Sequence, residues 1–306
     1  MAAPEVPPSP SCRSETVTTA DGLRLHVACY GEPRPGARTV LCLPGLTRTG
    51  ADFEPLARAL AADPQLPRRV LALDYRGRGQ SDYDPDPANY TVPVETGDVI
   101  GVLQAFDAAP AIIVGTSRGG LIAMVLAAVR PELIAGVVFN DIGPAIERDG
   151  LLRIKSYVGA IPGTMGAPRD YDEAAALLRG LFADQFPNLT AGDWHAAARR
   201  GFRADGDHLI TTYDPALARG LDSLTPETPL PALWKEFDAL QGKPVMVIRG
   251  ALSDILSPAT VGEMQRRRPD LETIEIADQG HPPLLREPDV IARIAAFARR
   301  CDVRAN

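Results

Sequence analysis

The chain has 306 residues and a formal net charge of −7, from 32 lysines and arginines against 39 aspartates and glutamates. This length suits one large α/β domain or two small ones. The acidic balance argues against non-specific nucleic-acid binding, which needs a basic surface, and no apolar run is long enough to span a membrane. We therefore expect a globular protein with neither nucleic acid nor membrane as a partner.

The N-terminus is proline-rich, with no basic start and no apolar run of signal-peptide length. We expect residues 1–12 to form a disordered tail and the protein not to be secreted. The four cysteines match neither a metal-binding pattern nor a small disulfide framework. We expect reduced thiols and a cytoplasmic location. These cysteines are Cys12, Cys29, Cys42 and Cys301.

The predicted elements begin with a β-hairpin, in which segments 16–19 and 23–30 flank an Asp21-Gly22 turn. Short continuous apolar runs then alternate with helical segments. Such runs are typical of strands buried on both faces of a parallel sheet, joined by βαβ crossovers. The runs lie at 40–43, 70–73, 112–114, 137–139 and 245–248, and the first three helices at about 52–62, 94–108 and 118–130.

The alternation breaks between residues 144 and 242, where the pattern predicts helices with little strand. Thr190 and Asp193 form a capping signature, and Pro231 suits the first turn of a helix that carries Trp234 and Phe237. The alternation then resumes. Its last predicted elements are a helix at 259–268, a strand at 273–276 and a helix at 288–300. A helical insertion therefore interrupts one α/β domain.

The strongest chemical signal is the G-x-S-x-G motif Gly115-Thr116-Ser117-Arg118-Gly119, which follows a predicted strand and opens a predicted helix. A sharp turn at this point lifts the Ser117 hydroxyl out of the sheet. Side chains at positions 115 and 119 would clash in that turn, so glycine is needed at both. The motif predicts a nucleophilic serine.

With this motif in place, the chain resembles the α/β-hydrolase family over nearly its whole length. The resemblance implies a mostly parallel eight-stranded sheet in a core of residues 13–143 and 243–306, with 144–242 as an inserted helical cap. Four further segments carry it: Leu43-Pro44-Gly45-Leu46-Thr47, the loop 74–82, Gly250-Ala251-Leu252-Ser253-Asp254, and Gly280-His281-Pro282. We interpret the charged 74–82 loop as structural.

The resemblance assigns His281 as the base that takes the proton of Ser117, a role that suits imidazole at neutral pH. His26 is expected to face outward from the hairpin, whereas His195 and His208 lie in the cap. A buried carboxylate must orient the base. The family position for this acid is Asp254, which we favour. Asp141 is the alternative, because some family members carry the acid after the preceding strand.

The resemblance also implies an oxyanion hole made by the backbone N–H groups of Leu46 and Arg118. Pro44 stands where the family usually has histidine, and its effect on the pocket floor stays open. We expect the Arg118 side chain to enter a polar network behind the turn. Two cap aromatics, Tyr157 and Trp234, are candidate pocket residues, although burial in the cap core explains them equally well.

These expectations describe a serine hydrolase that cleaves small-molecule carboxylic esters through an acyl-enzyme on Ser117, without a cofactor or metal. A lactonase, a carbon–carbon bond hydrolase, a perhydrolase or an acyltransferase would use the same three side chains, because fold and triad do not set the substrate. A hydrolase-fold ligand receptor with little turnover is the alternative of another class. The sequence carries no signal for the oligomeric state.

Overall fold

The computed structural model describes residues 12–161 and 166–302. Most of the expected disordered tail, residues 1–12, lies outside these ranges. Its last residue, Cys12, instead begins the first strand and pairs with Tyr30 across the hairpin. The core therefore begins one residue earlier than the sequence predicted.

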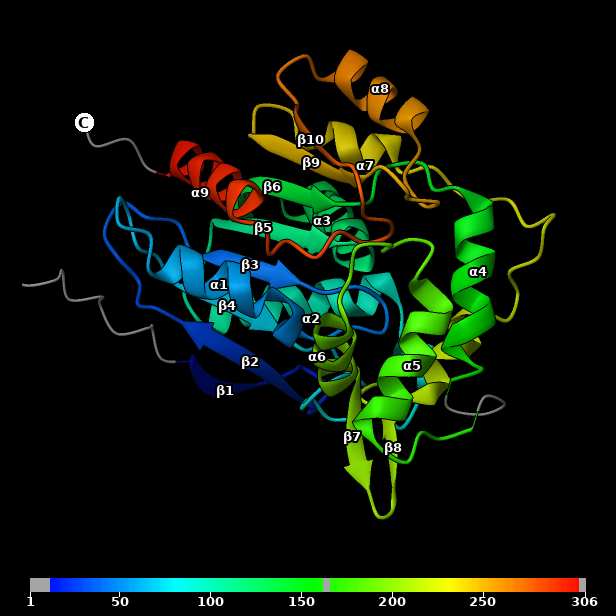
Figure 1. The fold of residues 1–306 in the computed structure, drawn as a ribbon. Helices are drawn as coiled ribbons and strands as arrows, with labels where there is room; N and C mark the ends of the chain where they lie inside the picture. Colours follow the sequence, from blue (N-terminus) through cyan, green and yellow to red (C-terminus); the bar gives the residue numbers. More distant parts are fainter. Residues whose placement is uncertain (1–11, 162–165, 303–306) are drawn as a thin grey trace, which may run out of the picture.

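A single sheet of eight strands, in the order β1-β2-β4-β3-β5-β6-β9-β10, runs through the molecule (Figure 1). The hairpin pair β1–β2 and the pair β2–β4 are antiparallel, and every other pair is parallel. This confirms the predicted mostly parallel sheet. The strands are β1 (Cys12–Thr18), β2 (Arg24–Tyr30), β3 (Val40–Leu43), β4 (Val70–Leu73), β5 (Ala111–Thr116), β6 (Ile134–Asn140), β9 (Val245–Gly250) and β10 (Glu272–Ile276).

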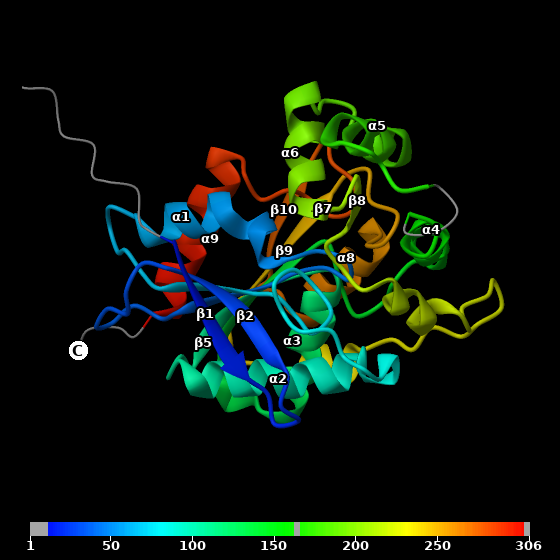
Figure 2. The same ribbon diagram turned by 90° about the horizontal axis from the view of Figure 1, so that it is seen from below.

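Helices cover both faces of the sheet, with α1 (Glu54–Ala61) and α9 (Pro288–Cys301) on one side and α2 (Val92–Ala105) and α3 (Arg118–Val129) on the other (Figure 2). Each central strand contributes side chains to the apolar clusters on both faces of the sheet. In β3, Val40 and Cys42 pack towards α1 and α9, whereas Leu41 and Leu43 pack towards α2 and α3. Burial on both faces explains why these strands are continuous apolar runs rather than alternating ones.

The strand order reverses between β3 and β5, because β4 lies on one side of β3 and β5 on the other. At such a switch point the loops after the two strands diverge and leave a crevice at the carboxyl edge of the sheet. The loop after β3 begins at Pro44, and the turn after β5 carries Ser117. The topology therefore brings two of the segments singled out by the sequence to one place.

The segment between β6 and β9 has a small apolar cluster of its own, formed mainly by Leu178, Phe182, Phe186 and Trp194. It contains a two-stranded hairpin in addition to the expected helices. Thr190 and Asp193 form the predicted capping box at the start of α6. The elements are α4 (Arg148–Val158), α5 (Tyr171–Phe182), α6 (Ala191–Gly201), β7 (Phe202–Asp205), β8 (His208–Thr211) and α7 (Trp234–Asp238).

The last helix of this segment belongs to the main core by its packing. The Phe237 ring lies 6.2 Å from that of Phe139 in β6, and both residues are part of the large core cluster. The helix begins at Trp234, three residues after Pro231, so the prediction that Pro231 occupies its first turn is wrong. This helix therefore packs with the sheet core rather than with the separate apolar cluster of the segment.

The final helices, α8 (Pro258–Arg267) and α9, lie where the sequence predicted them within two residues. Each begins with proline at its first helical position, where the missing N–H has no partner to lose. In the described ranges, no helix combines the length and the apolar character that crossing a membrane requires.

Candidate active site

Ser117 occupies a strained turn between β5 and α3, with φ 49° and ψ −113°. A side chain on Gly115 would place Cβ 2.7 Å from backbone atoms of Gly119, and one on Gly119 would place Cβ 2.2 Å from the Leu43 carbonyl oxygen. No side chain fits at these distances, which is the physical reason for both glycines. Positive φ at a serine is costly, and such strain is characteristic of functional positions.

The imidazole of His281 lies between Ser117 and Asp141. Its Nε2 is 2.9 Å from Ser117 Oγ, and its Nδ1 is 2.8 Å from Asp141 Oδ2. An ionised carboxylate only accepts hydrogen bonds, so Nδ1 carries the proton and Nε2 is left to accept from the serine hydroxyl. The Asp141 side chain is fully buried and that of His281 nearly so. This arrangement can remove the Ser117 proton and hold the resulting imidazolium.

The structure does not place Asp254 at the base, so the expectation that it orients His281 is wrong. Its carboxylate instead binds the guanidinium of Arg153 in α4 through both oxygens. Burial raises the pKa of Asp254, but the hydrogen bonds and charge of Arg153, with smaller contributions from Gln185 and His281, together lower that pKa below its usual range. Asp141 directly follows β6, the neighbour of β5 in the sheet, and its carboxylate is the one that meets His281 Nδ1.

The loop after β9 contributes to the site in another way. Ser253 Oγ donates a 2.5 Å hydrogen bond to Asp141 Oδ2, and the Gly250 N–H donates a 2.9 Å bond to Oδ1. The backbone N–H groups of Ile255 and Leu256 donate to Ser253 Oγ in turn. The sequence singled out this loop but chose Asp254 rather than Ser253, because no local pattern shows that a serine binds a distant carboxylate.

The two segments expected to form an oxyanion hole lie on either side of Ser117. A methyl group on Gly45 would lie 3.7 Å from Ser117 Cβ, so the loop that contains Leu46 is in contact with the serine. Arg118 is the first residue of α3, where a backbone N–H has no acceptor within the helix. The Arg118 side chain turns away, as predicted, and donates to Glu95 through Nε at 2.5 Å.

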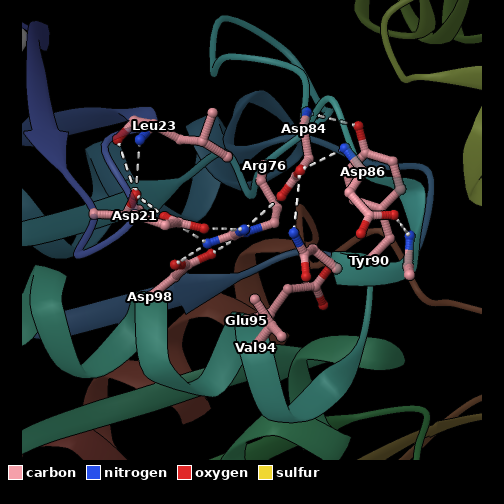
Figure 3. A network of polar contacts seen from close by, with 12 residues as sticks. Asp21, Leu23, Arg76, Asp84, Asp86, Tyr90, Val94, Glu95 and Asp98 are labelled. Carbon is pink, nitrogen blue, oxygen red and sulfur yellow. Dashed lines mark hydrogen bonds and ion pairs between the residues drawn. The ribbon is translucent and has the colours of Figure 1, made fainter.

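The 74–82 loop is held by ion pairs, several of them buried, which fits the structural interpretation given to it. Arg76 binds three carboxylates, those of Asp21, Asp84 and Asp98 (Figure 3). His26, expected to face outward, is instead only 11% exposed, and its Nδ1 lies 2.9 Å from Asp74.

A mostly apolar cavity lies next to Ser117 and His281, between the sheet edge and the segment that joins β6 to β9. It meets Thr116 and Pro282, the chain neighbours of Ser117 and His281, and it also meets Gly45. Ser117 and His281 themselves do not line the cavity. Its cap wall is formed by side chains of α5, α6 and the connection between them: Leu178, Phe182, Phe186, Leu189, Trp194 and Ala197.

The two aromatic residues predicted to line the pocket lie elsewhere. Tyr157 packs edge-on against Phe182 at 5.1 Å, and Trp234 packs edge-on against Phe237 at 6.2 Å, beneath the guanidinium of Arg267. Neither is among the residues that line the cavity. Burial in the cap core, the alternative, fits Tyr157, which packs against the small cluster of the insertion, whereas Trp234 packs against the main apolar cluster.

The segment between β6 and β9 contacts the loop that carries His281. The side-chain oxygen of Gln185, which follows α5, accepts a hydrogen bond from the His281 N–H at 3.2 Å. Asn140, at the end of β6, holds the same loop by donating to the Pro283 carbonyl at 2.9 Å. In residues 12–161 and 166–302, no group of three or more His, Cys, Asp or Glu side chains has the arrangement of a metal site.

Sheet, turn and side-chain geometry together define a class of protein. The chain belongs to the alpha/beta hydrolase family, whose model matches residues 40–294. The chain is 35% identical over 283 residues to the 3-hydroxybutyrate-oligomer hydrolase of Cupriavidus necator, which covers 89% of this chain and 93% of that protein.

Two further relatives extend the comparison. An alpha/beta hydrolase from Novosphingobium aromaticivorans, known from a crystal structure, has a TM-score of 0.86 and 37% identity over 94% of this chain and 98% of its own. The 2-(acetamidomethylene)succinate hydrolase of Mesorhizobium japonicum is 28% identical over 78% of this chain and 79% of its own length. These relatives support hydrolysis as the activity of this chain, with small molecules as its substrates.

The geometry makes opposite predictions for the two aspartates. Asp141→Asn should lower kcat on an ester by about 10⁴-fold, because an amide at this position favours the wrong imidazole tautomer. Asp254→Asn removes only a half-buried ion pair, so it should cost about 1 kcal/mol of stability or less and leave kcat within a few-fold. Steady-state kinetics on one ester, with thermal unfolding of both variants, check this. A crippled Asp254→Asn beside an active Asp141→Asn would reverse the assignment.

Proposed function

We propose that the protein is a serine hydrolase that cleaves carboxylic esters through an acyl-enzyme on Ser117. The observation that carries the proposal is the continuous hydrogen-bonded chain from Ser117 through His281 to Asp141, set on a strained turn at the carboxyl edge of the sheet. A serine hydroxyl is a weak nucleophile unless an oriented base takes its proton. The esterases and other hydrolases among the relatives add support.

In the first half of the reaction, Ser117 Oγ attacks the ester carbonyl carbon while His281 Nε2 takes the hydroxyl proton. The tetrahedral intermediate carries a negative oxygen, which we expect the N–H groups of Leu46 and Arg118 to bind. The intermediate then collapses. The carbon–oxygen bond to the alcohol breaks, and the departing alkoxide takes the proton from His281.

In the second half, water attacks the acyl-serine carbonyl and gives its proton to His281. Collapse of the second intermediate breaks the bond to Ser117 Oγ, which recovers the proton, and the carboxylic acid leaves. The buried Asp141 stabilises the imidazolium in both halves without taking its proton. Hydrogen bonds from Ser253 and Gly250 keep that carboxylate in place.

The apolar cavity favours esters with small or medium, rather apolar acyl groups. Its cap wall supplies leucine and aromatic side chains, and burial of such surface is the main source of binding free energy for apolar ligands. We propose that residues 144–242 act as a cap that sets this preference.

We further propose that the protein works in the reducing cytoplasm. Its four cysteines are free, as thiols are in that compartment.

Ser117→Ala tests the nucleophile. It should reduce kcat by about 10³- to 10⁶-fold while the protein stays folded. A serine-directed phosphonate should label Ser117 alone, and only while His281 is intact, as read by peptide mass spectrometry. Near-normal turnover by a folded Ser117→Ala protein, or a label on another residue, would remove the proposed mechanism.

A pair of variants, one on the cavity wall and one off it, tests the acyl pocket. Ala197→Leu should fill part of the cavity and lower the kcat/KM ratio of hexanoate to acetate esters by about tenfold, since each methylene in a pocket is worth roughly 1–3 kcal/mol. Trp234→Ala, which lies off the cavity, should lower stability on the order of 2 kcal/mol and leave that ratio unchanged. Equal ratios in the wild type and Ala197→Leu would place the acyl group elsewhere.

A further inference from the structure

The charged side chains along the cavity do not balance. Three arginines and two aspartates line it. Arg286 pairs with Asp193, and Arg200 Nε lies 3.0 Å from Asp52 Oδ1. Arg48 has only the second oxygen of the same aspartate, at 4.0 Å, and its side chain makes no hydrogen bond to any other residue in the described ranges. One guanidinium is therefore left without a carboxylate of its own.

The surplus guanidinium belongs to a side chain that starts next to the nucleophile. The point 3.7 Å from Ser117 Cβ, where a methyl group on Gly45 would lie, is also 3.6 Å from Arg48 Cγ. The side chain is 31% exposed and lies close to the cap. Burial raises the pKa of the cap phenol Tyr157, and the charge of Arg48 opposes part of that rise.

We propose that Arg48 binds a carboxylate of the substrate, so that the natural substrates are esters that carry a free carboxylate in addition to the ester bond. This rests on the proposed function, because it places the carboxylate relative to Ser117. Guanidinium and carboxylate form charge-assisted, often bidentate pairs that are strongest where water is partly excluded. The apolar walls of the cavity meet that condition, and the shared Asp52 leaves N–H donors of Arg48 open.

The test compares two substrates that differ only in charge: the linear dimer of 3-hydroxybutyrate with a free carboxylate, and its primary amide. Each has one ester bond, and released product is measured by chromatography. The wild type should prefer the acid about tenfold or more in kcat/KM, the size of a charged hydrogen bond. Arg48→Gln should lose that preference while it cleaves the amide as before.

Arg286→Gln is the matched control, because it removes a cation from the same cavity that already has a carboxylate. It should keep the acid-to-amide ratio of the wild type. The inference is overturned if the wild type cleaves both dimers equally, or if Arg48→Gln lowers both rates alike. It is also overturned if neither dimer is cleaved while simple esters are. Failure of the proposed function is separate: it would appear as turnover by Ser117→Ala.

A second, independent observation concerns a fully buried carboxylate behind the site. Glu95 in α2 accepts from Arg78 Nη1 at 2.7 Å through one oxygen and from Arg118 Nε at 2.5 Å through the other. The side chains of Glu95 and Arg78 are 0% exposed. A buried ion with fewer partners would be costly, so this carboxylate holds both guanidinium groups in fixed positions.

The two guanidinium groups are each connected to one of the two oxyanion segments. Arg78 contacts the segment that contains Leu46, and Arg118 is part of the other segment. Arg78 Nε donates to the Leu46 carbonyl at 2.9 Å, and Arg78 itself is packed between the rings of Tyr75 and Tyr90. Arg118 carries the other N–H on its own backbone. The Leu46 carbonyl shares a rigid peptide plane with the Thr47 N–H. The bond from Arg78 therefore fixes the peptide that directly follows the Leu46 N–H and limits the motion of the loop that carries it.

We infer that Glu95 is a positioning residue that aligns the Leu46 and Arg118 N–H groups for the oxyanion. Two loops that reach the site from different strands are thereby tied to one carboxylate. Oxyanion donors act only when they are aimed correctly before charge develops. The inference rests on the proposed function, because it needs that oxyanion.

The Glu95→Gln variant tests whether Glu95 aligns the oxyanion donors, with Asp98→Asn as its matched control. Asp98 lies one turn further along α2, is nearly as buried, and pairs with Arg76 of the same 74–82 loop, but the pair touches neither oxyanion segment. Both variants should lower the melting temperature. Glu95→Gln should also lower kcat by about 10- to 100-fold with KM little changed, below or near the cost of losing one oxyanion donor. Asp98→Asn should keep kcat within about twofold.

Inhibitor binding separates alignment from general loosening. A trifluoromethyl ketone forms a tetrahedral adduct on Ser117, so its Ki should rise in Glu95→Gln by the same factor as kcat falls. Should Glu95→Gln fail to fold, Arg118→Lys, which shortens the reach to Glu95, should show the same pattern at about tenfold. Equal kcat losses in Glu95→Gln and Asp98→Asn, or an unchanged Ki in the variant that folds, would overturn the inference.

Discussion

The site depends on how closely α3 approaches the end of β3. The first turn of the helix lies so near the Leu43 carbonyl that position 119 has no room for a side chain. At this approach Ser117 adopts a positive φ, and the loop after β3 is in contact with the serine. The strain is local, but the packing that maintains it involves the whole switch point of the sheet, because β3 and β5 are neighbours there.

Local patterns predict the elements that local physics determines. The buried strands were recognisable because both faces of β3 to β6 need apolar side chains, and the serine turn because its glycines leave no alternative. The choice between Asp141 and Asp254 is of another kind. Both follow strands at the same edge, and only the return path of the loop that carries His281 decides which carboxylate it meets. That path depends on packing far along the chain, including the bond from Asn140 to Pro283.

The sequence also does not predict which charged side chains pair or which residues line the cavity. Glu95 lies 17 residues after Arg78 and 23 residues before Arg118 in the sequence. No periodicity connects the three positions. The aromatic residues of the cap illustrate the same limit. Composition cannot tell whether Trp194 or Trp234 lines the cavity, because the orientation of α6 and α7 on the core decides which side chain faces it.

The bond between Gln185 and the His281 backbone has a consequence for protein engineering. The segment that shapes the substrate cavity also steadies the loop of the base, so the two cannot be exchanged as separate modules. A chimera with a cap taken from a relative would acquire that relative's cavity walls and, unless glutamine is retained at this position, lose an anchor of its own imidazole. Altered selectivity in such chimeras would then come with slower turnover on every substrate, including those that fit the new cap well.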